Sequence, residues 1–182
     1  MRRSGNLKKA VFLDRDGVIS QALIDDGRPY SPRKKEELFI LTGVSEAVEL
    51  LLSHGYLPVV VTNQPDIARG FTTFEHVSEM HKIISNRTGL QHFYVCVHDE
   101  QDKCQCRKPK TGMLTNAARE LSLNLNESFL VGDRWKDIQA GQNAGCHCFF
   151  IDNGYLEKRP EPPFHTVVSL LEAASYITEG KC

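Results

Sequence analysis

Short apolar runs alternate along the chain with stretches whose apolar residues recur at helical spacing. Runs of four to six apolar residues without polar alternation are typical of strands buried on both faces of a sheet. They predict strands at Ala10–Leu13, Leu57–Val61, Phe93–Val97, Ser128–Val131 and Cys146–Ile151.

The stretches between these runs predict helices. A stripe from Val44 to Leu52 ends at His54-Gly55, and a stripe from Phe74 to Ile84 has Thr72 or Thr73 as its N-cap. The same spacing predicts helices at Met113–Leu121, Ile138–Ala144 and Val168–Ile177. Alternating strands and helices predict one α/β domain, a Rossmann-like three-layer sandwich with a mostly parallel sheet. Such folds bind ligands at the carboxyl ends of the strands.

Composition sets the limits of this domain. The chain has 182 residues, with 22 Lys and Arg against 23 Asp and Glu, so its net charge gives no general electrostatic case for nucleic acid or an anionic membrane. Residues 1–8 are basic and predict a flexible tail, because no apolar run of signal-peptide length follows them. We therefore expect a cytoplasmic protein, and we expect it to be a monomer.

Two aspartates follow the first predicted strand. If the extended backbone continues, Asp14 and Asp16 lie on one side with Arg15 opposite, and Gly17 allows a sharp turn. Two close carboxylates repel unless a cation or a proton separates them, so the pair suits Mg²⁺. It also suits a division into a nucleophile and a proton donor and acceptor. The alternative is an ordinary polar exit from a strand.

Other strand ends and turns carry groups that bind phosphate. The second predicted strand ends in Thr62-Asn63-Gln64, whose hydroxyl and amides can contact phosphoryl oxygens. Lys108 can offset phosphoryl charge, and Arg107 can grip a second anionic or hydroxyl group. Each of these segments alone could also be a solvated turn.

The fourth predicted strand runs into Gly132-Asp133-Arg134. Asp133 lies where it could complete a Mg²⁺ shell, whereas Asp137 could lie below it or merely favour the helix dipole.

Together these segments resemble the haloacid dehalogenase (HAD) superfamily of phosphohydrolases, over about residues 9–152. The resemblance implies that Asp14 becomes an aspartyl-phosphate and that Asp16 acts as general acid and base. It implies that Thr62 and Lys108 hold the phosphoryl oxygens, and that Mg²⁺ binds Asp14, the Asp16 carbonyl and Asp133. The matching motifs are Asp-x-Asp-Gly at 14–17, Thr62, Lys108 and Gly-Asp-x-x-x-Asp at 132–137.

A second metal site is predicted within residues 96–106. Cys96, His98, Cys104 and Cys106 supply three thiolates and one imidazole, the closed tetrahedral set of a structural Zn²⁺ site. The intervening loop is polar and has little core of its own, so a metal would fix its shape. The pattern Cys146-His147-Cys148 predicts a buried strand instead, because alternate residues of a strand face opposite ways.

This loop, directly before Arg107-Lys108-Pro109, resembles the subfamily of histidinol-phosphate and heptose bisphosphate phosphatases. The resemblance implies a structural zinc that orders Arg107 and Lys108, and no large cap domain. It makes Asn63, Gln64, Arg107 and Arg134 candidate substrate contacts. Three positions depart from the subfamily: Val97 replaces a proline, Pro65-Asp66 replaces Ser-Gly, and Arg134 replaces a lysine.

Three functions compete. The leading expectation is removal of the 7-phosphate of D-glycero-D-manno-heptose 1,7-bisphosphate, in which Arg107 and Arg134 recognise the distal phosphate or sugar hydroxyls. The alternative substrate is histidinol phosphate, since the gap between His98 and Cys104 is short. The third is a zinc-containing binding module without catalysis.

Overall fold

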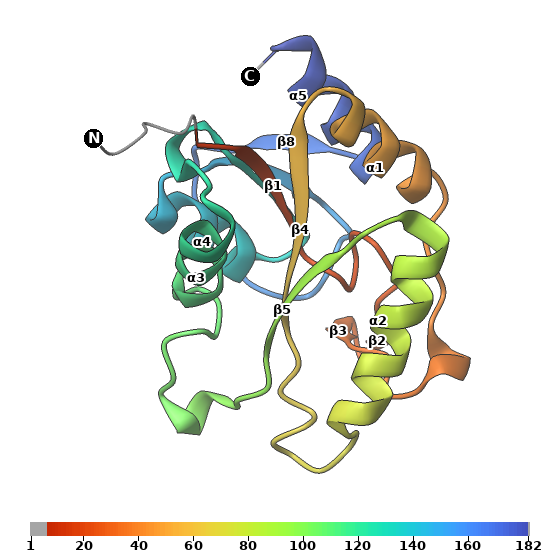
Figure 1. Ribbon diagram of the computed structural model, residues 1–182. Helices are drawn as coiled ribbons and strands as arrows, with labels where there is room; N and C mark the ends of the chain where they lie inside the picture. Colours follow the sequence, from red (N-terminus) through yellow and green to blue (C-terminus); the bar gives the residue numbers. More distant parts are fainter. Residues whose placement is uncertain (1–6, 182) are drawn as a thin grey trace.

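A computed structural model describes residues 7–181 as an α/β sandwich (Figure 1). One sheet has six strands in the order β5-β4-β1-β6-β7-β8, and every neighbouring pair is parallel. A separate antiparallel hairpin joins β2 and β3. The strands are β1 (Lys9–Leu13), β2 (Leu23–Asp25), β3 (Arg28–Tyr30), β4 (Tyr56–Asn63), β5 (His92–Cys96), β6 (Phe129–Gly132), β7 (His147–Ile151) and β8 (His165–Val167).

Helices cover both faces of the sheet, as the alternating pattern predicts. Helices α1, α2 and α5 lie on one side and α3 and α4 on the other (Figure 1). They are α1 (Val44–Ser53), α2 (Phe74–Thr88), α3 (Gly112–Leu121), α4 (Trp135–Ala144) and α5 (Leu170–Glu179), with 3-10 turns η1 (Lys35–Glu37), η2 (Glu100–Asp102) and η3 (Leu125–Glu127). The predicted Rossmann-like three-layer fold is confirmed.

Strand β1 shows how the sequence divides the core. Val11 and Leu13 pack under α1 and α5, whereas Ala10 and Phe12 pack under α3 and α4. The side-chain period of two therefore sends alternate residues into two separate hydrophobic cores. The central strands β1, β4 and β6 consequently need apolar residues at nearly every position.

Local sequence also sets the helix ends. The Thr73 side chain accepts a hydrogen bond from the His76 amide, and Gly89 ends α2 with a left-handed backbone. Asp137 accepts from the Arg134 amide and so starts α4 three residues before the predicted Ile138.

Several predicted boundaries and exposures need correction. Strand β5 is only partly buried, because it lies at the edge of the sheet. The hairpin β2–β3 and strand β8 were not predicted, since three-residue strands give too short a pattern to detect.

The two long connections contain small elements. Residues 18–43 hold the hairpin and η1, and residues 64–92 hold α2, so neither builds a large cap. Of the predicted tail 1–8, residues 1–6 lie outside the described part of the chain, and Lys8 already hydrogen-bonds to Ser122 and Asn124. Within residues 7–181, no helix is both long and apolar enough to cross a membrane.

Candidate active site and metal sites

The carboxyl ends of three adjacent strands bring the predicted catalytic residues together. Asp14 follows β1, Thr62 lies near the end of β4, and Asp133 follows β6, and β4, β1 and β6 are neighbours in the sheet. Asp14, Asp16, Thr62 and Lys108 line one cavity of about 50 Å³, together with Asn63, Arg134 and Asp137.

Lys108 is the cation at the centre of this cluster. Its side chain is only 1% exposed, and Nζ lies 2.6 Å from Asp14 Oδ1 and 2.7 Å from Asp137 Oδ1. The ammonium also donates to the Val61 carbonyl at 2.7 Å. Three acceptors therefore fix the three protons of the Lys108 ammonium.

Negative charge exceeds positive charge at this point. Oxygens of Asp14, Asp133 and Asp137 lie within 4.8 Å of one another, so three carboxylates face one ammonium. Burial raises the pKa of Asp14 to about 7, against the opposing effect of Lys108, and Asp137 adds to the rise. Burial and then the charge of Asp14 also raise the pKa of Asp133. A dication would offset the two excess negative charges.

The two aspartates of the Gly-Asp-x-x-x-Asp motif differ in their free oxygens. Asp133 is buried, and its Oδ1 has no hydrogen-bond partner among the described residues. Both oxygens of Asp137 already have a partner: Oδ1 pairs with Lys108, and Oδ2 accepts from the Arg134 amide. The donor set thus fits a hard cation such as Mg²⁺ at Asp14 and Asp133, with Asp137 anchoring Lys108.

Asp16 is held away from this charge cluster by its own partners. Arg15, which is fully buried, donates to both Asp16 oxygens at 2.8 Å, and Ser20 and Gln64 donate at 2.9 and 3.0 Å. Burial alone would raise the pKa of Asp16, but the Arg15 guanidinium brings it below its usual value. Arg15 therefore does not point away as the extended geometry predicted: the chain turns after Asp14, and Arg15 wraps round to Asp16.

The three polar residues after the β4 core take different positions. Asn63 exchanges two hydrogen bonds of 3.1 Å with the backbone of Lys108 and lines the cavity. Gln64 is fully buried and donates to Thr62 Oγ1 at 2.8 Å as well as to Asp16. Gln64, a predicted substrate contact, thus supports two site residues from behind and is not among the residues lining this cavity.

A second cavity, of about 220 Å³, is lined partly by the same residues and contains the predicted arginines. Arg134 is already engaged by Glu157: its Nε donates to the two carboxylate oxygens of Glu157 at 3.0 and 3.1 Å. Arg107 donates to the His98 carbonyl at 3.2 Å and lies 3.8 Å from Glu100, while its buried Nε has no partner among the described residues. Arg107 therefore retains more donor capacity than Arg134.

Cys96, His98, Cys104 and Cys106 converge as their spacing predicts. The sulfur atoms of the three cysteines lie 3.2 to 3.7 Å apart, and His98 Nδ1 is 3.3 Å from Cys106 Sγ and 3.7 Å from Cys96 Sγ. A disulfide needs about 2.05 Å between its sulfurs. A tetrahedron with Zn–S bonds of about 2.3 Å has edges of roughly 3.8 Å, so the four ligands fit a metal of that type.

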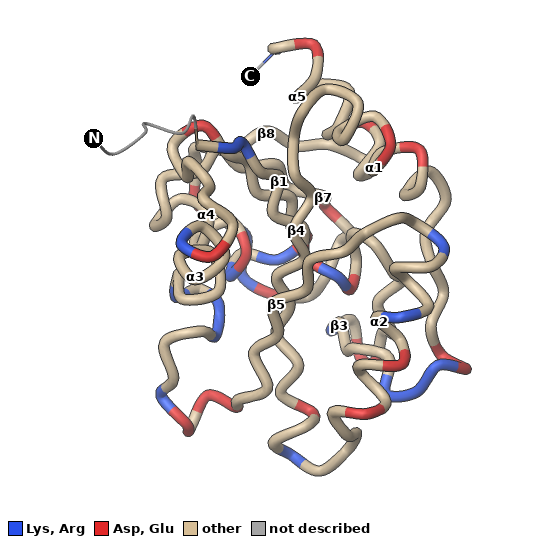
Figure 2. Tube along the Cα trace, viewed as in Figure 1, with Lys and Arg blue, Asp and Glu red and all other residues tan. Residues whose placement is uncertain are grey.

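Asp66, one of the positions that depart from the subfamily, is neutralised by two arginines. It is buried and pairs with Arg33 Nε at 2.8 Å and with Arg69 at 3.5 Å. Arg69 in turn binds both oxygens of Asp99 in the Cys/His loop, which lowers the pKa of Asp99 to about 2. Figure 2 shows acidic and basic stretches adjoining one another at loop 97–103 and at segment 33–37.

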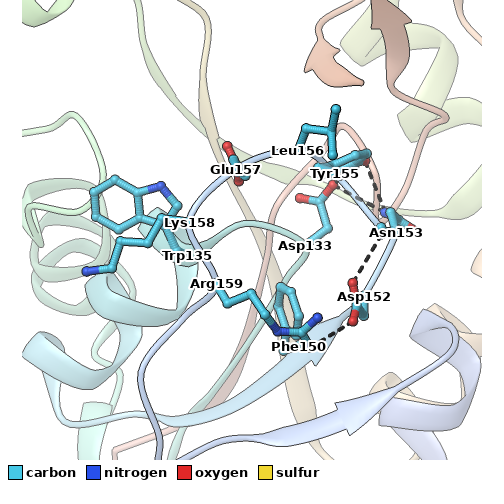
Figure 3. A pocket seen from close by; sticks show the side chains of 11 residues that line it. Asp133, Trp135, Phe150, Asp152, Asn153, Tyr155, Leu156, Glu157, Lys158 and Arg159 are labelled. Carbon is cyan, nitrogen blue, oxygen red and sulfur yellow. Dashed lines mark hydrogen bonds and ion pairs between the residues drawn. The ribbon is translucent and has the colours of Figure 1, made fainter. Parts of the chain in front are cut away.

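Sequence reasoning missed the loop that follows β7. Asn153 and Tyr155 contact Asp133, and Glu157 contacts Arg134, so three residues of one loop support the site (Figure 3). The only local signal was the Asn153-Gly154 pair, which marks a turn but says nothing about what the loop touches.

Comparisons with known proteins agree with this geometry. A family model described as HAD-hydrolase-like matches residues 105–173. The D-glycero-beta-D-manno-heptose-1,7-bisphosphate 7-phosphatase of Pasteurella multocida is 37% identical over 167 residues, which cover 86% of this chain and 85% of that protein. The enzyme of the same name from Photorhabdus laumondii is 39% identical over 147 residues, covering 74% and 75%.

A solved structure is similar over nearly the whole chain. The D,D-heptose 1,7-bisphosphate phosphatase from B. bronchiseptica, crystallised with magnesium and phosphate, superposes with a TM-score of 0.81 at 25% identity. The match covers 94% of this chain and 99% of that one.

The carboxylate cluster makes a prediction about Lys108. Replacing it with methionine leaves three buried carboxylates without their ammonium, so we expect Lys108→Met to lower the free energy of unfolding by about 3–5 kcal/mol in buffer without added Mg²⁺. Urea denaturation measures this, with Lys82→Met, an exposed lysine on α2, as the matched control. Equal stability of the two variants would contradict the proposed charge balance.

Proposed function

The chain belongs to the HAD-like hydrolases, in the group of the heptose bisphosphate phosphatases, and on that premise we propose that it removes the 7-phosphate of D-glycero-beta-D-manno-heptose 1,7-bisphosphate. The observation that carries this proposal is the cavity where Lys108 joins Asp14 beside the unpartnered oxygen of Asp133. An anionic nucleophile can approach a phosphoryl dianion only where positive charge is provided for both.

The proposed reaction uses two half-reactions. In the first, a carboxylate oxygen of Asp14 attacks phosphorus, the bond from phosphorus to the sugar oxygen breaks, and Asp16 gives its proton to that oxygen. In the second, Asp16 takes a proton from water as the water oxygen attacks the same phosphorus, which frees Asp14 and inorganic phosphate. Bound Mg²⁺ supplies charge neutralisation between the nucleophile and the phosphoryl oxygens.

The surroundings of Asp16 suit both of these roles. Without substrate, Arg15, Ser20 and Gln64 stabilise its ionised form, which is the form that acts as base. An incoming phosphoryl dianion raises the pKa of Asp16 by repulsion, which favours the protonated form needed to protonate the leaving oxygen.

We assign the remaining contacts by the charge of each side chain and its place in the two cavities. Thr62 and Lys108 bind the transferred phosphoryl group, and Asn63 holds the Lys108 backbone. The distal phosphate is bound by Arg107 and by Arg28 of the hairpin. Both line the 220 Å³ cavity, and no ion pair occupies Arg28 among residues 7–181. Arg134 contributes through the guanidinium edge that Glu157 leaves free.

Zinc is proposed for the Cys/His cluster, as a structural ion. Its loop leads directly into Arg107 and Lys108, so a fixed loop fixes the two cations. None of the five described cysteines forms a disulfide, which supports a reducing compartment such as the cytoplasm. A monomer stays our prediction.

Asp14→Asn tests the nucleophile. The amide keeps the shape of the side chain but cannot form the acyl phosphate, so we expect a folded protein whose kcat falls by several orders of magnitude. Phosphate release and the circular dichroism spectrum measure the two effects. Glu49→Gln, an exposed carboxylate on α1, is the control, and near-normal turnover of Asp14→Asn would remove Asp14 from its role.

The substrate is tested by direct comparison. Because a second phosphate adds charge-assisted hydrogen bonds, we expect kcat/KM for the heptose bisphosphate to exceed that for histidinol phosphate by about tenfold or more at equal Mg²⁺. A larger value for histidinol phosphate would overturn the substrate assignment while leaving the phosphatase class intact. If phosphate is released from neither compound and not from an aryl phosphate either, the result would favour the binding module.

Zinc removal tests the structural ion. We expect about one zinc per purified chain, and we expect Cys104→Ser to lose it, to expose amides of residues 96–106 to hydrogen exchange, and to lose activity. Elemental analysis and mass-spectrometric exchange provide the measurements. Cys146→Ala, outside the cluster, should behave as the parent protein. A parent protein that is fully folded and active but contains no zinc would contradict a structural role for zinc.

A further inference from the structure

The loop after β7 holds one oxygen of Asp133 from outside the sheet. The Tyr155 hydroxyl donates to Asp133 Oδ2 at 2.6 Å, and Asn153 Nδ2 donates to the same oxygen at 3.3 Å. Asn153 also donates to the Gly17 carbonyl at 3.1 Å, which ties the loop to the turn after Asp16. Figure 3 shows Asp133, Tyr155 and Asn153 facing one another at the end of a cavity of about 560 Å³.

The other oxygen of Asp133 is left without a partner. Oδ1 is buried and accepts no hydrogen bond within the described chain, although an unmet buried acceptor costs free energy. Asp133 also has an oxygen within 4.8 Å of oxygens of Asp14 and Asp137. One oxygen is therefore saturated by two donors while the other remains available for a cation.

Packing restricts the same carboxylate. Gly17 has φ +95, and a Cβ there would lie 1.7 Å from Asp133 Oδ2 and 2.9 Å from the Tyr155 hydroxyl. Asp133 Oδ2 thus occupies the space that a side chain at position 17 would take, and it packs closely against the Gly17 backbone. Contact on one side and two donors on the other leave the Asp133 carboxylate little freedom to rotate.

Tyr155 is itself held in place by the residues that follow it. The Leu156 amide donates to the Gly27 carbonyl at 2.8 Å, and the Leu156 side chain packs where a Cβ on Gly27 would be. Glu157 then pairs with Arg134. The loop is anchored to the hairpin and to the start of α4, so its tyrosine does not depend on the hydrogen bond to Asp133 for its position.

We propose that Tyr155, assisted by Asn153, is a positioning residue that orients Asp133 so that its free oxygen binds Mg²⁺. The inference rests on the proposed function, because it presupposes a magnesium site at Asp14 and Asp133. Groups that hydrogen-bond to a metal ligand fix its orientation, and their removal typically weakens metal affinity by 10- to 100-fold.

The test is a titration of the 182-residue protein with Mg²⁺ alone. Calorimetry measures the binding, and the rise in Tm with Mg²⁺ concentration provides a second measurement. We expect Tyr155→Phe to bind Mg²⁺ about 10- to 100-fold more weakly than the parent, while its Tm without Mg²⁺ stays close to the parent value. At saturating Mg²⁺ its kcat should return towards that of the parent. Asn153→Ala removes the longer hydrogen bond to Asp133 together with those to the Gly17 carbonyl and the Tyr155 hydroxyl, and it should weaken affinity in the same direction.

The matched control is Tyr94→Phe. The Tyr94 hydroxyl also donates to a carboxylate, Glu120 at 2.7 Å, but on α3 away from the cluster, so its removal should leave Mg²⁺ affinity unchanged. Parent-like affinity in Tyr155→Phe, beside a parent protein that does bind Mg²⁺, overturns this inference and spares the proposed function. A parent protein that binds no Mg²⁺ overturns the magnesium site and the inference together.

Discussion

Three clustered, buried carboxylates, two of which pair with one ammonium, are the constraint around which the site is built. Asp14, Asp133 and Asp137 come from the ends of β1 and β6 and from α4, and Lys108 comes from the segment after the Cys/His loop. Removing charges from water is costly unless each has a partner. The excess negative charge therefore favours a dication. It also explains why Lys108 is almost fully buried, whereas lysines ordinarily stay in solvent.

Other carboxylates near this cluster have arginine partners of their own and do not compete for Lys108. Arg15 holds Asp16, and Arg33 and Arg69 hold Asp66, each pair satisfied away from Lys108. Because a guanidinium binds a carboxylate in a fixed planar geometry, these pairs set positions as well as charge. The Arg69–Asp99 contact extends the arrangement to the Cys/His loop. The loop that presents Lys108 is thus joined both to a metal-type cluster and to the segment after Thr62.

The parts of the site that the sequence predicted are those fixed by strand ends and short spacing. Asp14, Thr62 and Asp133 follow apolar runs, and parallel pairing must bring such ends together, so their convergence was predictable. The cysteine cluster was predictable because its ligands lie within residues 96–106. The roles of Tyr155 and Glu157 were not, since their loop has no periodicity and its path depends on how Leu156 packs on the hairpin. The hairpin itself was missed because its strands are only three residues long.

In the proposed reaction, substrate selection depends on which cations lack a carboxylate partner. Arg134, which the sequence predicted as a substrate contact together with Arg107, donates to Glu157, and Arg15 donates to Asp16. Arg107 keeps an unpartnered Nε, and its nearest carboxylate, that of Glu100, is 3.8 Å away and is also bound by Lys136 at 2.7 Å. A guanidinium that lacks a close carboxylate partner gains more from a phosphate than one that must first give up a carboxylate. The pairing of each arginine therefore says more about the distal group of the substrate than the number of arginines does.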